Sequence, residues 1–299
     1  MLGKMDRTCL IAGAGYTGLR LARRLQPRWR IVALARSAAA ATQLSAAGIE
    51  VLRADLDGQL EPGALSVADG AAIAYLVPPT EAADGDPRLA GFLGALGEAR
   101  PSALLYVSTT GVYGDTGGGV VTEASPLIPS SDRGRRRAAA ERIASEWCST
   151  RGVRRVILRV PGIYGPGRLP LDRLRRGEPA LRPEDSGPGN RIHVDDLVTA
   201  CVAALERPVQ GIFNVTDGDH SSTTEFMQRT AVLAGLPPPP LIALAEARGH
   251  ISPGMLSFLV ESRRVDNRRM REELGVRPRY AGLDAGIAAS LEEMRATRD

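Results

Sequence analysis

The chain has 299 residues, 43% of them hydrophobic and 24% charged, which is typical of a soluble globular protein of one or two domains. The net charge of +4 favours anionic small molecules, but the arginines are scattered, which argues against a nucleic-acid-binding protein. Three cysteines without a CxxC spacing argue against a disulfide framework and a zinc site, and no apolar run reaches bilayer length. We therefore expect a cytoplasmic protein with no metal, no membrane segment and no nucleic-acid partner.

Short apolar segments alternate with helical patterns through the first half of the chain. The predicted strands cover residues 7–13, 30–36, 49–55, 71–78, 103–110 and 154–160. The predicted helices cover residues 17–26, 39–48, 88–100 and 135–150. This alternation predicts the α/β class, with a Rossmann-type doubly wound parallel sheet.

The composition of the sequence changes after the segment YGPGR, which ends at Arg168. Proline and glycine become frequent there, and patterns typical of strands become fewer. We place a doubly wound domain at residues 1–165 and a smaller, mixed domain at 166–299. Part of 190–216 is expected to return to the main sheet. Residues 191–205 predict a short strand that enters a helix, and residues 211–218 predict a further strand.

Gly13, Gly15 and Gly18 form a GxGxxG motif that follows an apolar strand and begins a helix. In this setting the first glycine permits a tight turn, the second lets the backbone approach a pyrophosphate, and the third allows close packing of helix on sheet. The helix start, with Tyr16 and Thr17, offers unpaired N–H groups to the phosphates. The motif predicts a dinucleotide cradle; the alternative is a turn that is merely rich in small residues.

The end of the second predicted strand indicates which dinucleotide is bound. An Asp or Glu usually meets a ribose 2′-hydroxyl there, whereas this chain has Arg36 and Ser37. The planar fork of an arginine can pair with a 2′-phosphate, so we expect NADP in preference to NAD, unless Arg36 is a solvated surface residue. Asp55, after the third strand, is expected either to bond the adenine amine or only to cap a helix.

Three further motifs carry a family resemblance: VSTTGVYG at 107–114, LRVPGIYGPGR at 158–168 and IHVDDLVTA at 192–200. With the cradle, they resemble the extended short-chain dehydrogenase/reductase family, the NAD-dependent epimerase/dehydratase group. Residues 262–280 are similar to the family's C-terminal segment, so the likeness covers nearly the whole chain. The resemblance implies an NAD(P)-dependent oxidoreductase or epimerase that acts on a carbonyl or nucleotide-sugar-like small molecule, and it is compatible with a homodimer.

The resemblance also implies a hydroxyl at the reacting end of the cofactor. Family members carry Ser or Thr three residues before the Val of VYG, where it bonds the reacting carbonyl or alcohol; here that residue is Thr109. The alternative is that Thr109 is a β-branched residue that ends a strand. Dehydratase relatives place an Asp-Glu pair next, but Thr110 and Gly111 stand there, which argues against sugar dehydration.

The chain departs from the family at its YxxxK motif. The aligned stretch, IPSSDRGRRRAAAE, has Arg133 at the tyrosine position and Arg137 at the lysine position. Arginine keeps its proton at neutral pH, so Arg133 cannot replace the tyrosine as acid or base. Arg133 could instead polarise a carbonyl or hold an anion and Arg137 could reach the nicotinamide ribose, unless both belong to a solvated basic helix face. Our second hypothesis is therefore a catalytically silent NADP(H)-sensing regulatory protein.

Two positions depart from the motifs of nucleotide-sugar members of the family. Gly162 and Gly189 stand where nucleotide-sugar members of the family carry Asn and Arg. Arginines nearby could still hold an anionic substrate, namely Arg168, Arg173, Arg182 and Arg191.

His193 with Asp195 and Asp196 indicates only a strand that runs into a helix, where one of the two aspartates would be the cap.

Overall fold

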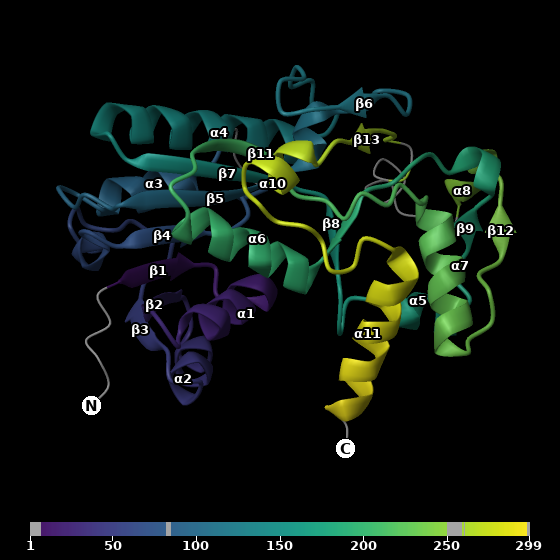
Figure 1. The fold of residues 1–299 in the computed structure, drawn as a ribbon, viewed down its shortest axis with the longest axis horizontal. Coiled ribbons are helices and arrows are strands. Elements are labelled where there is room, and N and C mark those ends of the chain that lie inside the picture. The colour runs from purple at the N-terminus through teal and green to yellow at the C-terminus, as the bar shows by residue number, and fades with distance from the viewer. Residues whose placement is uncertain (1–6, 82–84, 250–258, 260, 298–299) are drawn as a thin grey trace.

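The computed structural model describes residues 7–81, 85–249, 259 and 261–297. Its centre is a seven-stranded sheet in the order β11-β7-β5-β4-β1-β2-β3, in which every neighbouring pair is parallel (Figure 1). The strands are β1 (Thr8–Ala12), β2 (Arg30–Ala35), β3 (Glu50–Arg53), β4 (Ala72–Tyr75), β5 (Ala103–Thr109), β7 (Arg154–Val160) and β11 (Gly211–Asn214). The predicted doubly wound parallel sheet is confirmed.

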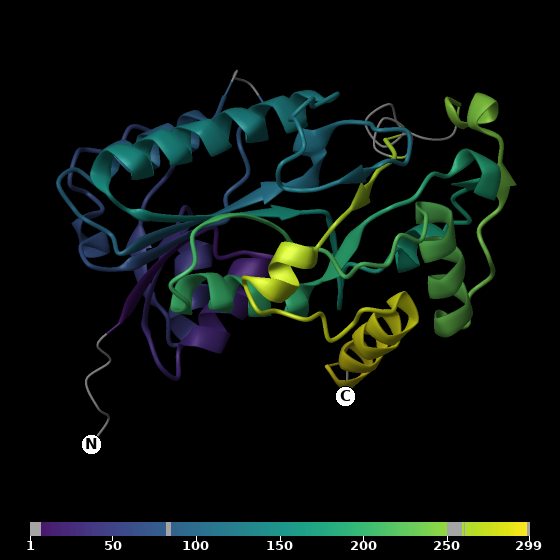
Figure 2. The ribbon, with the colours of Figure 1, turned by 45° about the horizontal axis from the view of Figure 1, so that its top comes forward.

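Helices cover both faces of this sheet (Figures 1 and 2). On one face lie α1 (Tyr16–Leu25), α2 (Ala38–Ala46) and α6 (Val194–Glu206). On the other lie α3 (Pro87–Ala95) and α4 (Asp132–Arg151). The third helix is shorter than the predicted 88–100 because the chain turns at Gly97, which has a φ of 57°. The fourth is longer than the predicted 135–150 because Ser131 caps it at Gly134 N–H and a left-handed Gly152 ends it.

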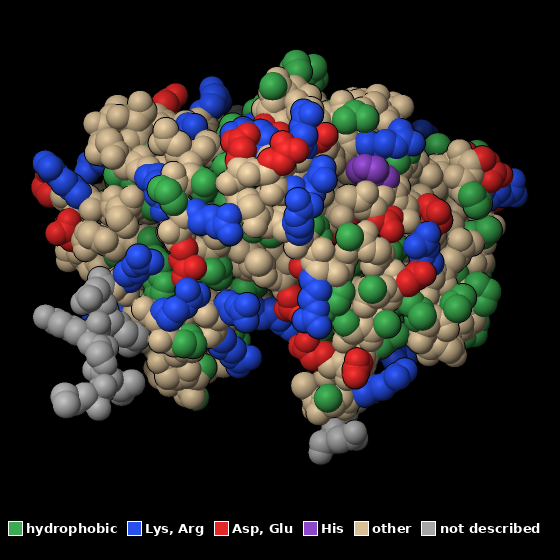
Figure 3. All heavy atoms as spheres, in the orientation of Figure 1, with side chains coloured by type: hydrophobic (Ala, Val, Ile, Leu, Met, Phe, Trp, Pro, Cys, Tyr) green, Lys and Arg blue, Asp and Glu red, His purple; other side chains and the backbone are tan. Residues whose placement is uncertain are grey.

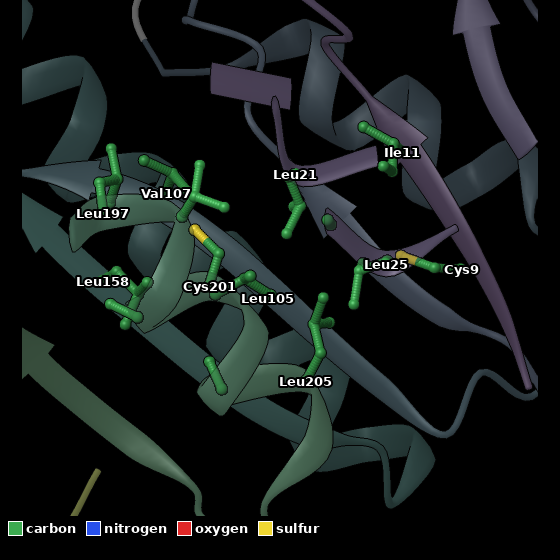
Figure 4. Close-up of a cluster of buried hydrophobic side chains, with 14 of the residues drawn as sticks. Cys9, Ile11, Leu21, Leu25, Leu105, Val107, Leu158, Leu197, Cys201 and Leu205 are labelled. Carbon is green, nitrogen blue, oxygen red and sulfur yellow. The ribbon is translucent and has the colours of Figure 1, made fainter. Parts of the chain in front are cut away.

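Alternate residues of each strand point to opposite faces, which divides the core into two layers. In one layer, drawn in Figure 4, strand side chains such as Ile11, Leu105 and Leu158 pack against apolar side chains of α1 and α6. Toward α3 and α4 point residues such as Ile73 and Leu104. Because both faces are covered, the strands read in the sequence as nearly continuous apolar runs.

A smaller unit lies beyond the carboxyl ends of the central strands (Figure 1). Its two-stranded sheets pair β8 (Gly162–Tyr164) with β10 (Arg191–His193), β9 (Ala180–Leu181) with β12 (Leu241–Ile242), and β6 (Val120–Val121) with β13 (Arg264–Val265). Its helices are α5 (Leu171–Arg175), α7 (Thr223–Ala234), α8 (Leu244–Ala247) and α11 (Leu283–Ala296). The short helix α10 (Arg268–Glu272) packs instead on the central sheet beside β11, and its Met270 belongs to the core layer of α1 and α6. Segment 190–216 belongs to both parts, because β10 pairs with β8 while α6 and β11 pack in the central layers.

The surface carries mixed charge. On the face drawn in Figure 3, the described Lys and Arg side chains lie among Asp and Glu over most of the surface, and several of them adjoin one another along its lower middle. None of the helices in the described residues is both long enough and apolar enough to cross a bilayer.

Candidate cofactor and substrate site

The glycine motif forms a tight turn between β1 and α1. Gly13 has a φ of 95°, and a Cβ on it would lie 3.0 Å from backbone atoms of Leu76 and Val77, just beyond β4. A Cβ on Gly18 would collide with the carbonyl oxygen of Gly13, so helix and turn pack backbone to backbone. A Cβ on Gly15, in contrast, would meet nothing within 4 Å. The backbone at Gly15 therefore faces open space at the switch point between β1 and β4.

The first turn of α1 has the chemistry that a phosphate requires. It has no acidic residue and no side-chain cap, so its N–H groups stay available. The ring of Tyr16 lies between two guanidinium groups, with its centroid 4.2 Å from Cζ of Arg20 and 4.0 Å from Cζ of Arg168. Its hydroxyl donates to the carbonyl oxygen of Pro166 at 3.0 Å, while Thr17 is buried. Tyr16 thus connects the start of α1 to the loop that carries Arg168.

The residues predicted for the adenosine end lie at the carboxyl ends of β2 and β3. Arg36 is exposed, and its Nη1 donates to Asp57 Oδ2 at 3.0 Å. Arg88 donates two further hydrogen bonds to the same carboxylate, at 2.5 and 2.9 Å, and the two arginines lower the pKa of Asp57. Ser37 caps α2, and Asp55 accepts a hydrogen bond from the backbone N–H of Asp57.

A cavity of about 820 Å³ lies where the carboxyl ends of β5 and β7 meet the smaller unit. Thr109, from β5, and Arg133, from the first turn of α4, both line it. The hydroxyl oxygen of Thr109 accepts a hydrogen bond from Gly111 N–H at 3.2 Å, so its O–H remains able to donate. Arg133 is exposed and has no carboxylate partner among the described residues.

Arg137 is not among the side chains that line this cavity. Its Nη1 donates to the hydroxyl of Tyr106 at 3.0 Å and to the carbonyl oxygen of Val107 at 2.9 Å. A longer bond of 3.4 Å reaches the carbonyl oxygen of Val77, which follows β4. The side chain therefore fastens α4 to β4 and β5, one helical turn from Arg133.

A buried ion pair fixes α4 against the strands that carry the site. Glu141 accepts hydrogen bonds from Arg159 on β7, the shortest at 2.7 Å, and from Ser108 on β5 at 2.5 Å. Both ionic side chains are nearly inaccessible, at 3% and 4% exposure. Sequence reasoning missed Glu141, although its place four residues after Arg137 puts the two on one helix face.

Two tyrosines of the family motifs do not offer a replacement for the missing tyrosine. Tyr113 donates to Asn214 Oδ1 at 2.7 Å and accepts from Arg159 at 2.9 Å, so its hydroxyl is fully engaged. The ring of Tyr164 lines the cavity, but its hydroxyl is buried beside Gly286 and has no partner in the described part of the chain. Burial raises the pKa of Tyr164, so its hydroxyl is a poor acid.

The aspartates predicted to cap α6 do not do so. His193 itself is the cap, because its Nδ1 accepts from the N–H of Asp195 while its Nε2 bonds Ser290 at 3.1 Å. Asp196 instead accepts from the N–H groups of Arg279 and Tyr280, which ties the C-terminal segment to α6. Burial lowers the pKa of His193, which fits a neutral structural imidazole. The described residues contain no cluster of three His, Cys, Asp or Glu side chains that could hold a metal.

Comparison with known proteins identifies the family. Residues 90–216 match the model of the NAD dependent epimerase/dehydratase family. The structure of a functionally unknown conserved protein from Silicibacter pomeroyi DSS is 33% identical, over 98% of this chain and 99% of that one, with a TM-score of 0.78. The chain belongs to the NAD dependent epimerase/dehydratase family.

Two curated relatives of this family member carry names of enzymes. A 3-diazoavenalumate denitrifying reductase of Streptomyces sp is 32% identical over 141 residues, which cover 44% of this chain and 45% of the reductase. A dTDP-glucose 4,6-dehydratase of Actinoplanes sp. is 28% identical over 209 residues, 65% of this chain and 61% of the dehydratase. The chain thus spans about half the length of the curated relatives it matches.

The residues of this epimerase/dehydratase-family protein fit the family's dinucleotide. The open backbone at Gly15 leaves room that a side chain would fill, and the uncapped start of α1 offers N–H donors to a pyrophosphate. The cavity with Thr109 and Arg133 lies at the carboxyl ends of the same parallel sheet.

Proposed function

We propose that this protein is an NADP(H)-preferring oxidoreductase that reduces a carbonyl group of a small anionic molecule. The observation that carries the proposal is that one cavity holds both Thr109 and Arg133. Arg168 supports it further, because this side chain lines the cavity and also stacks on Tyr16 at the cradle. Arg133 and Arg137 then stand in place of the Tyr and Lys of YxxxK.

A bound nicotinamide supplies the hydride. The O–H of Thr109 donates to the substrate carbonyl oxygen, and the guanidinium of Arg133 stabilises the negative charge that develops there. Since Arg133 keeps its own proton, the proton for the product alcohol comes from water, either directly or through Thr109, which then takes a proton back from water. Water can enter here because Arg133 is exposed. Reduction is favoured over alcohol oxidation because the family's proton-accepting tyrosine is absent. Arg137 holds α4 against β5 and would meet the nicotinamide ribose only with its remaining donors.

The preference for NADP rests on Arg36. Its guanidinium is exposed at the end of β2, the place where an acidic residue would meet a 2′-hydroxyl. A 2′-phosphate can replace Asp57 as its partner, because Arg88 keeps the Asp57 carboxylate paired. Ser37 and Asp55 would border the same ribose and adenine.

An anionic substrate is supported by the charge of the cavity. Arg133 and Arg168 line it without a carboxylate partner among the described residues. The names of the relatives point the same way, because 3-diazoavenalumate and dTDP-glucose are both anions.

The test is titration with NADPH, NADP, NADH and NAD, followed by a panel of carbonyl acids and nucleotide sugars while nicotinamide absorbance is recorded. We expect tighter binding of NADPH than of NADH, and turnover that Thr109→Ala lowers about 100-fold while Thr109→Ser retains most of it. Binding of NADPH without turnover on any compound would support the second candidate, a silent NADP(H) sensor. The observation behind this candidate is Arg133, which stands where the family carries its catalytic tyrosine. Absence of dinucleotide binding would refute both.

A further inference from the structure

Arg191, on β10, is a buried cation without an anionic partner. It is 8% exposed and lines the cavity. Its guanidinium donates to the carbonyl oxygen of Ser221 at 2.6 Å and to the hydroxyl of Thr223 at 3.2 Å, both neutral acceptors. No carboxylate of the described residues lies within ion-pair distance of it. A buried charge without a counter-ion opposes folding, so its presence at a cavity wall requires another reason.

The surroundings hold this guanidinium in one place. A Cβ on Gly189 would lie 3.1 Å from its Nη1 and 2.8 Å from the carbonyl oxygen of Ser221, so glycine leaves the room that the arginine occupies. The ring of Phe226, on α7, lies against the guanidinium, with its centroid 4.6 Å from Cζ. Gly189 and Phe226 line the same cavity.

Three acidic residues act on Arg191 at longer range, namely Asp217, Asp219 and Glu225, and none of them forms an ion pair with it. Asp217 is 3% exposed, and burial raises its pKa to about 8, which disfavours its charged form at neutral pH. Asp219 accepts hydrogen bonds from Ser221 N–H and Leu283 N–H and lies near Arg229. The charge of Arg191 is therefore left for an anion that enters the cavity.

We propose that Arg191 binds the carboxylate of a substrate that has one acidic group and an aromatic or unsaturated apolar body. This assignment rests on the proposed function, since it names the substrate class of the same cavity. One carboxylate matches one buried guanidinium and can accept two parallel hydrogen bonds from it. The apolar body of the substrate would contact Ile163, Phe226 and Met227, which line the cavity.

A nucleotide diphosphate sugar fits this part of the cavity less well. It brings a second negative charge, and the other buried arginine of the lining, Arg263, is already paired with Glu261 at 2.5 Å. The unpaired Arg133 and Arg168 are exposed, where a cation is well hydrated and adds less binding energy.

The experiment is calorimetric titration of the full chain, with and without saturating NADP, using trans-cinnamate as carboxylate probe. Cinnamamide serves as the neutral isostere and UDP-glucose as the diphosphate probe. We expect Arg191→Gln to weaken cinnamate binding about 10- to 100-fold and to change cinnamamide binding less than about twofold. The matched control Arg175→Gln removes an exposed positive charge that pairs with Asp172, and it should leave cinnamate affinity unchanged.

Thermal melting of the ligand-free variants separates binding from folding. We expect Arg191→Gln to melt at or above the wild-type temperature, because it removes an unpaired buried charge. A lower melting temperature with unchanged cinnamate affinity would make Arg191 a structural tie between β10 and α7 and overturn the proposal. The proposal is also overturned if the wild-type protein binds NADP but not cinnamate, or if it binds UDP-glucose through Arg191 instead. In those two cases the proposed reductase function still stands. If the wild-type protein does not bind NADP, both the reductase function and the role of Arg191 are refuted.

Discussion

Asp217 links the stability of the fold to pH. Its side chain is 3% exposed, one carboxyl oxygen accepts from Asp219 N–H, and the other has no partner in the described part of the chain. Burial therefore raises its pKa from 3.8 to about 8. Between pH 3.8 and about pH 8, Asp217 is protonated in the folded protein but ionised in the unfolded chain. The contribution of Asp217 to stability is therefore greatest below about pH 4 and is lost as pH rises toward 8.

The substitution Asp217→Asn removes this dependence while keeping size and shape. A change of one in pKa corresponds to about 1.4 kcal/mol. The raised pKa of Asp217 therefore lowers the free energy of unfolding at pH 8 by up to about 5 kcal/mol. We expect the variant to match the wild type near pH 4 and to exceed it at pH 8 by a Tm difference of up to about 10 °C.

The assay is thermal or urea unfolding of ligand-free protein at several values between pH 4 and pH 8. The difference between the two curves reports Asp217 together with its electrostatic coupling to Asp219, Arg191 and Asp196. Asp219→Asn is the matched control, because hydrogen bonds from Ser221 lower the pKa of Asp219 and its loss should destabilise the protein at pH 8. A gap between wild type and Asp217→Asn that stays constant across this range would refute the burial argument.

Three further predictions concern the ion pair, the cofactor and the glycine turn. Glu141→Gln should lower the free energy of unfolding, measured with urea, by about 3–5 kcal/mol, because it leaves the buried Arg159 without a counter-charge. A decrease of less than about 1 kcal/mol would contradict this. Arg36→Ala should lower the ratio of NADP to NAD affinity about tenfold in a binding titration, whereas Arg30→Ala, at the other end of β2 and paired with Glu50, should not alter it. Gly15→Ala should keep the wild-type Tm but lose dinucleotide affinity, whereas Gly18→Ala should lower the Tm itself; equal melting of the two variants would contradict the turn geometry.

Local pattern was enough to determine the fold class and the position of the cradle. Segments such as 103–107 are continuous apolar runs, which parallel strands covered on both faces require. Gly13 and Gly18 sit where backbone must approach backbone, and that demand acts over a few neighbouring residues. The position of Thr109 at the end of a strand could likewise be predicted from the sequence, because the apolar run before it marks the strand.

Tertiary structure alone decided which charged side chains face the cavity. Arg133 and Arg137 are one helical turn apart, yet the first lines the cavity and the second is bound to Tyr106 and Val107 on β5. The sequence named Arg191 as one of four arginines that could hold an anion, but only the structure shows that it is a buried cation packed on Phe226. These outcomes depend on the desolvation of a charge by segments distant along the chain, which a local pattern does not encode.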